Sequence, residues 1–359
     1  MTRLCAHEPT RMSGRVPTVG FGICTPSQSE RVLSMEQKMP EIRTSRRGFH
    51  LFLASLLIAT ASMATAADQT QPEKKTVRLL TIGNSFSRNA TRYLPQLTEA
   101  GGHQLIHHPI VVGGASMQLH ADKAAQHAAD PDSLDGKYND KTSLVQRLKQ
   151  EPWDVVTIQQ ASRLSPHVES YRPYASQLKE IIQANAPQAQ LFIHETWAYR
   201  DDDPWFTKPA KGSGNPLTRD EMHRKLQAAY RTIAAELGAG LIPVGDAFQL
   251  VAEDSKWGYR PDQMFHFKEA IPPALPDQKN SLHVGWQWKK ENDKAVLKID
   301  AHHANVAGEF LGSCVFYEVL FGCDVSKNPF SPQGLDPEFA AFLKQTAHRA
   351  VSDLKTASK

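Results

Sequence analysis

The chain has 359 residues and a formal charge of +3 at neutral pH, to which the arginines of its N-terminal segment contribute. A charge this small does not suggest a nucleic-acid-binding surface, so we expect no nucleic-acid partner. The four cysteines are too few for a disulfide-stabilised scaffold, because only Cys314 and Cys323 lie outside the N-terminal segment. These two could pair across a helix end in an oxidising compartment, but we expect them to be unbonded.

The N-terminal segment has the pattern of an export signal. The run SRRGF, from Ser45 to Phe49, is a twin-arginine signature, and the apolar residues 51–59 and an A-x-A cleavage motif ending at Ala66 follow it. This apolar run is too short to anchor the chain in a membrane. We therefore expect residues 1–66 to be a leader that is cleaved near Ala66, and residues 67–76 to be a polar tether. The mature protein is expected in the periplasm or outside the cell, without a stable membrane span.

Short apolar strands alternate with helical segments through the rest of the chain. The expected strands are residues 77–82, 104–112, 153–159, 190–194 and 241–244. The expected helices are residues 89–97, 117–129, 143–149, 171–186, 220–237, 247–252 and 306–321. This alternation predicts one α/β domain over residues 77–355, with a mainly parallel sheet.

Two stretches interrupt the alternation, at about residues 197–217 and 255–298. In the second, the segments VGWQW and AVLKI alternate apolar and polar residues around a short polar turn, which predicts a β-hairpin. Aromatic-rich excursions from an α/β core often form the wall of a binding site, although such rings can equally pack against the core. The candidate wall residues in the insertions are Trp197, Trp286 and Trp288.

Ser85 follows the first strand-like run, which ends at Gly83. A strand, a one-glycine turn, a serine and a helix place a hydroxyl at the carboxyl end of the sheet, where open α/β sheets bind ligands. The free N–H groups of the helix start suit a developing oxyanion. The alternative reading is that Ser85 only caps a turn or a helix.

Asp300 and His303 form a second candidate group near the C-terminus. In a tight turn that leads into a helix, a spacing of three brings both side chains to one side, so the carboxylate can accept from Nδ1–H of the imidazole. The carboxylate then fixes the tautomer, and Nε2 is free to take a proton from a serine. A serine hydroxyl needs such a base because it is unreactive at its own pKa. His302 is expected to point elsewhere.

The motifs GNSFS at residues 83–87 and DxxH at residues 300–303, in this order on an α/β chain, resemble the SGNH (GDSL-type) hydrolase superfamily. The segments GGAS, WDVVTIQQAS and HHANVAGEFLGSCVFYEVL resemble one uncharacterised branch of it. The resemblance covers residues 77–322 and implies a flavodoxin-like, three-layer α/β/α fold. It also implies that Ser85 is the nucleophile, His303 the general base and Asp300 the orienting acid, and that no cofactor is needed.

The resemblance also implies an oxyanion hole, built from the backbone N–H groups of Ser85 and a glycine of the second block. Gly114 is the matching glycine, and Gly113 remains open because the register is uncertain. Asn84 stands where the superfamily has an aspartate, and its amide can still form hydrogen bonds in the turn.

The larger departure is in the third block, where the superfamily has an asparagine whose amide donates to the oxyanion. Here the strand ends in Gln159 and Gln160. A glutamine amide has the same donor on a longer arm, so Gln159 is the expected donor and Gln160 the alternative. Asn84 and Gln160 are also candidates for the substrate wall.

The sequence therefore predicts an exported serine esterase that acts by two-step acyl transfer on a small-molecule or glycan ester. Export and the tryptophan-rich insertion favour an acylated carbohydrate. The alternatives are a lipase or thioesterase, and a non-catalytic glycan-binding module on the same fold. Fifteen histidines are present, but none has zinc-type spacing, and we expect no metal. The pair His194 and Glu195 is expected to be structural or to line the site without a metal.

Overall fold

The computed structural model of the chain describes residues 73–207 and 214–357, all of them within the compact unit Asp68–Lys359. The predicted twin-arginine signature, the cleavage site and most of the tether lie outside the described residues. Within the described ranges, no helix is both long enough and apolar enough to cross a lipid bilayer.

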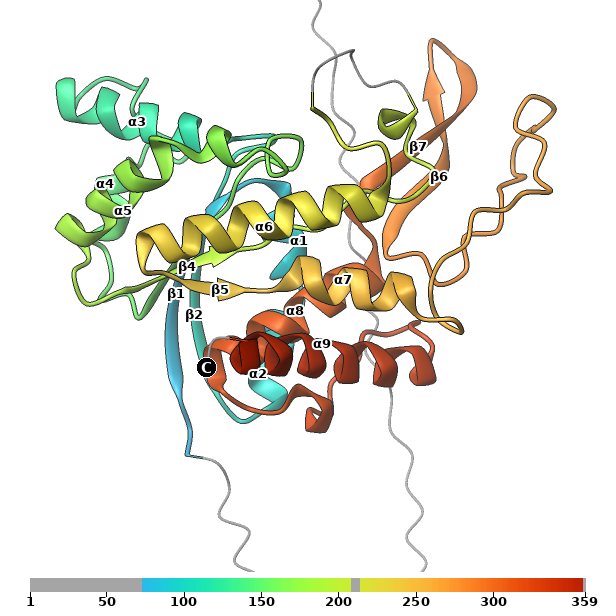
Figure 1. The fold of residues 1–359 in the computed structure, drawn as a ribbon. Coiled ribbons are helices and arrows are strands. Elements are labelled where there is room, and N and C mark those ends of the chain that lie inside the picture. Colours follow the sequence, from blue (N-terminus) through green and yellow to red (C-terminus); the bar gives the residue numbers. More distant parts are fainter. Residues whose placement is uncertain (1–72, 208–213, 358–359) are drawn as a thin grey trace, which may run out of the picture. The chain divides into compact units, whose positions relative to one another are not determined.

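A five-stranded parallel sheet forms the centre of the fold (Figure 1). Its strands are β1 (Thr76–Gly83), β2 (Gln104–Val111), β3 (Val155–Ile158), β4 (Gln190–His194) and β5 (Gly240–Ile242). They are arranged in the order β2-β1-β3-β4-β5, and every neighbouring pair is parallel. The strand order therefore reverses direction at β1, so the carboxyl end of β1 lies at the point where such sheets bind ligands.

Helices cover both faces of the sheet, which gives the predicted three layers (Figure 1). One group consists of α3 (Met117–Ala129), α4 (Leu144–Leu148), α5 (Tyr174–Asn185) and α6 (Arg219–Leu237). The other consists of α1 (Ser85–Ala90), α2 (Leu94–Ala100), α7 (Val244–Glu253), α8 (Val306–Phe321) and α9 (Pro337–Ala357). Among the described residues, three short 3₁₀ helices occur along the chain between these elements, at Val168–Tyr171, Pro204–Phe206 and Val325–Lys327.

Prolines account for two differences from the predicted helices. The expected helix at residues 89–97 is divided, because Pro95 fits the first turn of α2 but would break the interior of a longer helix. The expected helix at residues 171–186 begins only at Tyr174, directly after Pro173. The sequence patterns also missed α9, which packs on α8 and α7.

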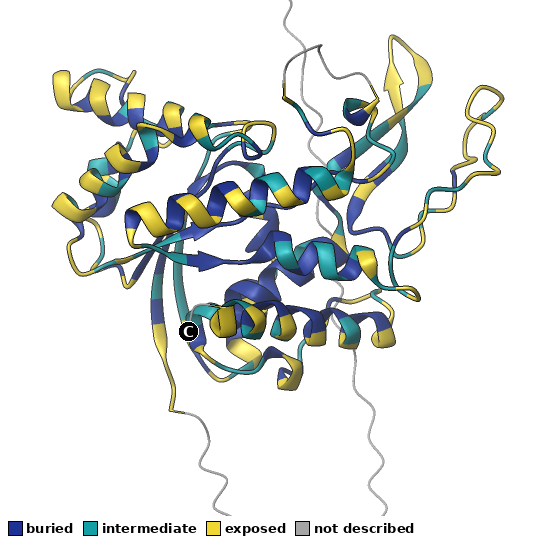
Figure 2. Ribbon diagram, in the orientation of Figure 1, coloured by how far each residue is buried: buried dark blue, intermediate teal, exposed yellow. Residues whose placement is uncertain are grey.

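The predicted hairpin is present and consists of β6 (His283–Glu291) and β7 (Lys294–Ala304). Its two turn residues, Asn292 and Asp293, have φ angles of 46° and 64°, as a two-residue hairpin turn of this hand requires. The hairpin forms a sheet of its own, and its tip is exposed (Figure 2). Its second strand extends beyond the predicted end of the insertion and carries both Asp300 and His303.

Helix α8 follows the hairpin directly and is apolar on nearly all sides, as expected for a helix enclosed by other elements. Cys314 is buried within it, and Cys323 lies just after its end. Both cysteines are free.

Candidate active site

The turn after β1 presents Ser85 as the first residue of α1, with Asn84 as the N-cap. The Asn84 side chain accepts a hydrogen bond from the Phe86 backbone N–H at 2.9 Å and donates one to the Ala115 carbonyl at 2.9 Å. An aspartate could accept the first bond but could not donate the second. The asparagine therefore ties the serine turn to the neighbouring turn at Gly114.

Glycine is required at the preceding position, Gly83. A Cβ atom there would lie 2.5 Å from Ser87 Oγ and 2.6 Å from Gln159 Cγ, which no side chain tolerates. The Gly83 carbonyl also accepts from Nε2 of His120 at 3.2 Å, and the other ring nitrogen contacts the Tyr138 hydroxyl at 2.9 Å. Burial lowers the pKa of His120 to about 4, so this imidazole is neutral and holds the end of β1 in place.

Ser85, His303 and Asp300 are connected in the order that general-base catalysis requires. His303 Nε2 lies 2.9 Å from Ser85 Oγ, and His303 Nδ1 lies 2.9 Å from Asp300 Oδ2. The three side chains come from two elements separated by more than 200 residues in the chain, α1 and β7. This is the arrangement in which a carboxylate orients an imidazole toward a hydroxyl.

The local context of the pair differs from the predicted tight turn. Asp300 and His303 both belong to the last part of β7, where the Asp300 carboxylate accepts from the backbone N–H of His303 at 3.0 Å. The pairing with β6 is irregular at this point, with a register shift between His283 and Gly285, so residues three apart can meet although a regular strand would point them to opposite faces. The prediction for His302 was also wrong, since its Nδ1 lies 3.4 Å from Asp300 Oδ1.

The electrostatics of the pair favour a charged carboxylate. Burial by itself would raise the pKa of Asp300, but hydrogen bonds from the side chain and backbone of His303, together with the charges of both histidines, lower it overall. Burial lowers the pKa of His302, and Asp300 partly opposes this change. Asp300 is therefore ionised at neutral pH and able to stabilise an imidazolium at His303.

Because β7 is not part of the parallel sheet, the segment that follows β4 has to hold its end in place. The Trp197 indole donates to the His302 carbonyl at 2.9 Å, and the Arg200 N–H donates to the Ala301 carbonyl at 2.8 Å. From β6, the His283 Nε2 contacts the Ala198 carbonyl at 3.1 Å. These contacts fix both strands of the hairpin against one loop.

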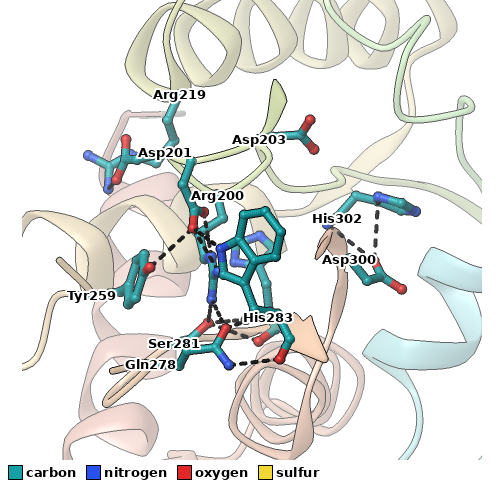
Figure 3. A network of polar contacts seen from close by, with 12 residues as sticks. Arg200, Asp201, Asp203, Arg219, Tyr259, Gln278, Ser281, His283, Asp300 and His302 are labelled. Carbon is teal, nitrogen blue, oxygen red and sulfur yellow. Dashed lines mark hydrogen bonds and ion pairs between the residues drawn. The ribbon is translucent and has the colours of Figure 1, made fainter. Parts of the chain in front are cut away.

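Arg200 is the centre of this attachment (Figure 3). Its side chain is only 2% exposed and pairs with both carboxylate oxygens of Asp202, at 2.6 and 2.8 Å. It also donates to Gln278 at 2.9 Å and to Ser281 at 3.1 Å, and it lies 4.3 Å from the ring centre of Tyr259. A buried arginine with a bidentate carboxylate partner and two further hydrogen bonds fixes the relative positions of the segments it joins.

Ser85 and His303 open onto a cavity of about 310 Å³. Its lining residues are Asn84, Ser85, Phe86, Gly114, Ala161, Ser162, Arg163, Tyr199, His302 and His303. Six of these were not predicted from the sequence as site residues: Phe86, Ala161, Ser162, Arg163, Tyr199 and His302. Ser162 was within the third sequence block, and its hydroxyl pairs with that of Tyr199 at 2.8 Å.

The predicted tryptophan wall does not line this cavity. Trp197 is fully buried and stacks between Phe86 and Phe248, so it supports the site from behind. Trp286 packs against Phe267 with its ring tilted by 47° and donates to Asp202, and the indole of Trp288 donates to the Ala274 carbonyl. Of the predicted wall residues, only Asn84 is in the lining. Trp197 belongs to the main hydrophobic core, whereas the rings of Trp286 and Trp288 contact the insertions.

The predicted oxyanion donors fall into two groups. Gly114 lines the cavity with a φ of 67°, a conformation that favours glycine, and the Ser85 N–H is one of the unpaired donors of the first turn of α1. The side-chain amide of Gln159 instead donates to the Gln160 carbonyl at 3.1 Å. Gln160 donates to the Ser170 carbonyl at 2.8 Å and accepts from the Met117 N–H. Both glutamines lie outside the lining of the cavity.

Asp300, His302 and His303 also have ligand atoms close enough together to hold a metal ion. Both ring nitrogens of His303 are already engaged, however, with Asp300 and with Ser85. His303 therefore connects the Ser85 hydroxyl to the Asp300 carboxylate, as a base between a hydroxyl and an acid.

Comparisons with known proteins agree with this fold. Residues 78–208 match the domain of unknown function DUF4886. A DUF4886 family protein from Bacteroides uniformis has a similar structure, with a TM-score of 0.57 and 26% sequence identity over 77% of this chain and 95% of that one. A comparison with curated proteins found no match.

Two further solved structures have lower scores. A candidate SGNH hydrolase from Slackia heliotrinireducens has a TM-score of 0.40 and 21% identity, over 68% of this chain and 98% of that one. A candidate GDSL-like lipase from Parabacteroides merdae has a TM-score of 0.37 and 12% identity, over 69% and 97% of the two chains. The parallel sheet between two layers of helices confirms the predicted fold class.

Proposed function

We propose that this chain, which has an SGNH/GDSL-like hydrolase fold with a DUF4886 domain, is a serine ester hydrolase. The observation that carries the proposal is the continuous contact from Asp300 through His303 to the Ser85 hydroxyl, with 2.9 Å at each step. A hydroxyl in contact with an oriented imidazole is an activated nucleophile. Its place at the start of a helix, beside Gly114, supplies N–H donors for a developing negative charge.

In the first half of the reaction, Ser85 Oγ attacks the ester carbonyl carbon while its proton moves to His303 Nε2. The carbonyl π electrons move onto oxygen, and this oxyanion accepts hydrogen bonds from the N–H groups of Ser85 and Gly114. When the intermediate collapses, the C–O bond to the alcohol breaks and His303 gives its proton to the departing oxygen. The acyl group is then bound to Ser85 as an ester.

In the second half, a water molecule enters beside His303 and attacks the acyl carbon. His303 takes one proton from the water and returns it to Ser85 Oγ as the acyl–serine bond breaks, so the acid leaves and the enzyme is restored. Asp300 stays ionised throughout, because its hydrogen bonds outweigh the effect of burial and lower its pKa.

The finer proposal is that the substrate is a short acyl ester of a carbohydrate. The cavity of about 310 Å³ is at the lower limit for ligand pockets, which suits a short acyl group better than a long chain. Its lining includes hydroxyl, imidazole and guanidinium groups from Ser162, Tyr199, His302 and Arg163. Such groups suit a polyhydroxylated alcohol.

We also propose that the protein is exported through the twin-arginine signature between Ser45 and Phe49. N-terminal sequencing of the exported protein should then begin at Ala67 or Asp68. Recovery of residues before Ala66 in the exported form would contradict cleavage at this position.

Labelling with an organophosphonate serine probe tests the enzyme proposal. The wild-type protein should be labelled at Ser85 and should hydrolyse p-nitrophenyl acetate faster than p-nitrophenyl octanoate. Ser85→Ala should lose labelling and at least about a thousandfold in kcat, as expected when a catalytic nucleophile is removed. A Ser162→Ala variant is the matched control, because its hydroxyl lines the same cavity without contacting His303.

The outcomes also separate the alternatives. A preference for the octanoyl ester would favour a lipase or thioesterase. Hydrolysis that persists in Ser85→Ala would contradict the nucleophile. If the wild-type protein is neither labelled nor active but binds acetylated oligosaccharides, it is a binding module on the same fold.

A further inference from the structure

A second group of acidic and histidine side chains lies inside the protein, at the carboxyl ends of β4 and β5. Glu195 follows β4 directly, Asp246 is in the first turn of α7, and His223 is on α6. Each offers one ligand atom, and these atoms all lie within 4.8 Å of one another. The mechanism above uses none of the three.

The group contains polar atoms without partners. Glu195 is 0% exposed, and neither of its carboxylate oxygens has a hydrogen-bond partner among the described residues. The same holds for Nδ1 of the buried His223. Burial of a carboxyl group without a partner is costly, so native proteins rarely leave one unless a proton or a cation completes it. The ring nitrogens of the neighbouring His194 also lack hydrogen-bond partners among the described residues, but this ring packs against Phe316 and Trp197 and is not one of the three grouped ligands.

The distance between two of the ligand atoms suits one metal ion bound by both. His223 Nε2 lies 3.5 Å from Asp246 Oδ1, which is long for a hydrogen bond. Two ligands of a tetrahedral zinc ion, each bonded at about 2.0–2.1 Å, are separated by about 3.4 Å. Two carboxylates and an imidazole are among the ligands that zinc binds.

Neighbouring side chains orient the Asp246 carboxylate, and a cavity connects the group to solvent. Gln227 and Arg231 donate hydrogen bonds to the two oxygens of Asp246, at 2.5 and 2.8 Å, and outer hydrogen bonds of this kind orient metal-binding carboxylates. Arg231 compensates one negative charge, which leaves Glu195 as the uncompensated carboxylate. A cavity of about 380 Å³ is lined by both His223 and Asp246, and it gives an ion a route to the group.

We propose that Glu195, His223 and Asp246 bind one divalent transition-metal ion, with zinc as the expected species. The ion would join the end of β4 to α6 and α7, directly before the segment 196–203 that holds the strand bearing His303. Its role is structural, and the proposal does not depend on the esterase activity.

The test uses the full chain, treated with a chelator and then titrated with zinc chloride alone. Isothermal calorimetry should show one ion bound per chain, and zinc should raise the Tm. Glu195→Gln should weaken zinc binding at least tenfold. Its neutral amide has nearly the shape of the protonated acid, so the variant should fold without metal.

Two controls locate the ion. His348→Ala alters a comparable group, Glu318, Asp324 and His348, in which Glu318 is already hydrogen-bonded to Val325 and His348. This variant should keep the zinc response. Asp300→Asn should also keep it, since a loss there would place the ion at the catalytic group and overturn the proposal. Absence of zinc binding by the wild-type chain, or unchanged binding by Glu195→Gln, would equally overturn it.

Discussion

The two halves of the candidate active site are built in different ways. Ser85 is positioned by a short continuous segment, in which β1, Gly83 and Asn84 determine where its hydroxyl lies. His303 is positioned from a distance, because β7 belongs to a separate hairpin and is attached through contacts of Trp197 and Arg200. The nucleophile therefore depends on local backbone geometry, and the base depends on a tertiary network.

This difference predicts where substitutions remote from the chemistry should matter. Arg200, Gln278 and Ser281 do not line the cavity, yet they hold the hairpin that carries His303. A displacement of about 1 Å between reacting groups can cost a hundredfold in rate. Changes in this network should therefore affect catalysis as well as stability.

The largest expected effect of this comparison comes from Asp300→Asn, which directly tests the half of the site that contains His303. The amide cannot hold the His303 tautomer or stabilise the imidazolium, so kcat should fall by about 10²–10⁴ with little change in KM. Steady-state kinetics on p-nitrophenyl acetate measures this. A fall of less than about tenfold would contradict the assigned role.

The same variant has a predicted pH signature in stability. The folded-state pKa of Asp300 is lowered, so its ionised form stabilises the fold above the unfolded pKa of about 3.9, and this contribution is lost as pH falls toward the folded value. Denaturant unfolding should therefore show a wild-type advantage at neutral pH that shrinks below about pH 4. An advantage that grows in acid would have the wrong sign.

Arg200→Ala tests the network that holds the base. It leaves the carboxylate of Asp202 without its partner, which should cost about 3–5 kcal/mol of stability. In the fraction that remains folded at low temperature, kcat should fall about tenfold to a hundredfold while KM changes less. Arg200→Lys should recover part of the stability but not the bidentate geometry.

The control for this comparison is Arg172→Ala. Arg172 pairs with Glu169 and Glu236 at the surface, so its loss should have little effect on stability and leave kcat unchanged. If a folded Arg200→Ala protein has wild-type kcat, the network does not position His303.

Among the site variants, Gln159→Ala has the smallest expected effect on turnover. It tests whether the Gln159 amide acts in the half of the site that contains Ser85. Its amide donates to the Gln160 carbonyl, and its carbonyl oxygen accepts from Ser87 Oγ at 3.1 Å. Loss of these buried bonds should reduce stability by about 1–3 kcal/mol, with kcat reduced less than tenfold. A loss of about 10²–10³ in kcat would instead identify this amide as an oxyanion donor.

The sequence motifs predicted the chemistry of the candidate site better than its walls. Ser85, Asp300 and His303 were identifiable because a hydroxyl, an imidazole and a carboxylate at these motif positions have few other joint uses. Trp197 and Trp286 were assigned to the cavity wall because they lie in aromatic-rich insertions. Trp197 instead packs on Phe248, and Trp286 packs against Phe267. Burial of a large ring depends on neighbours that sequence spacing does not reveal.

Local sequence determined the parallel sheet, most helix positions and the Gly83–Ser85 turn, because hydrophobic period, prolines and caps act within a few residues. It also determined the order of the three candidate catalytic residues. Only the tertiary structure decided that β7 carries the base, that Arg200 attaches it, and that Glu195 meets His223 and Asp246. Each of these depends on side chains far apart in the chain, and their distances are set by how the elements pack.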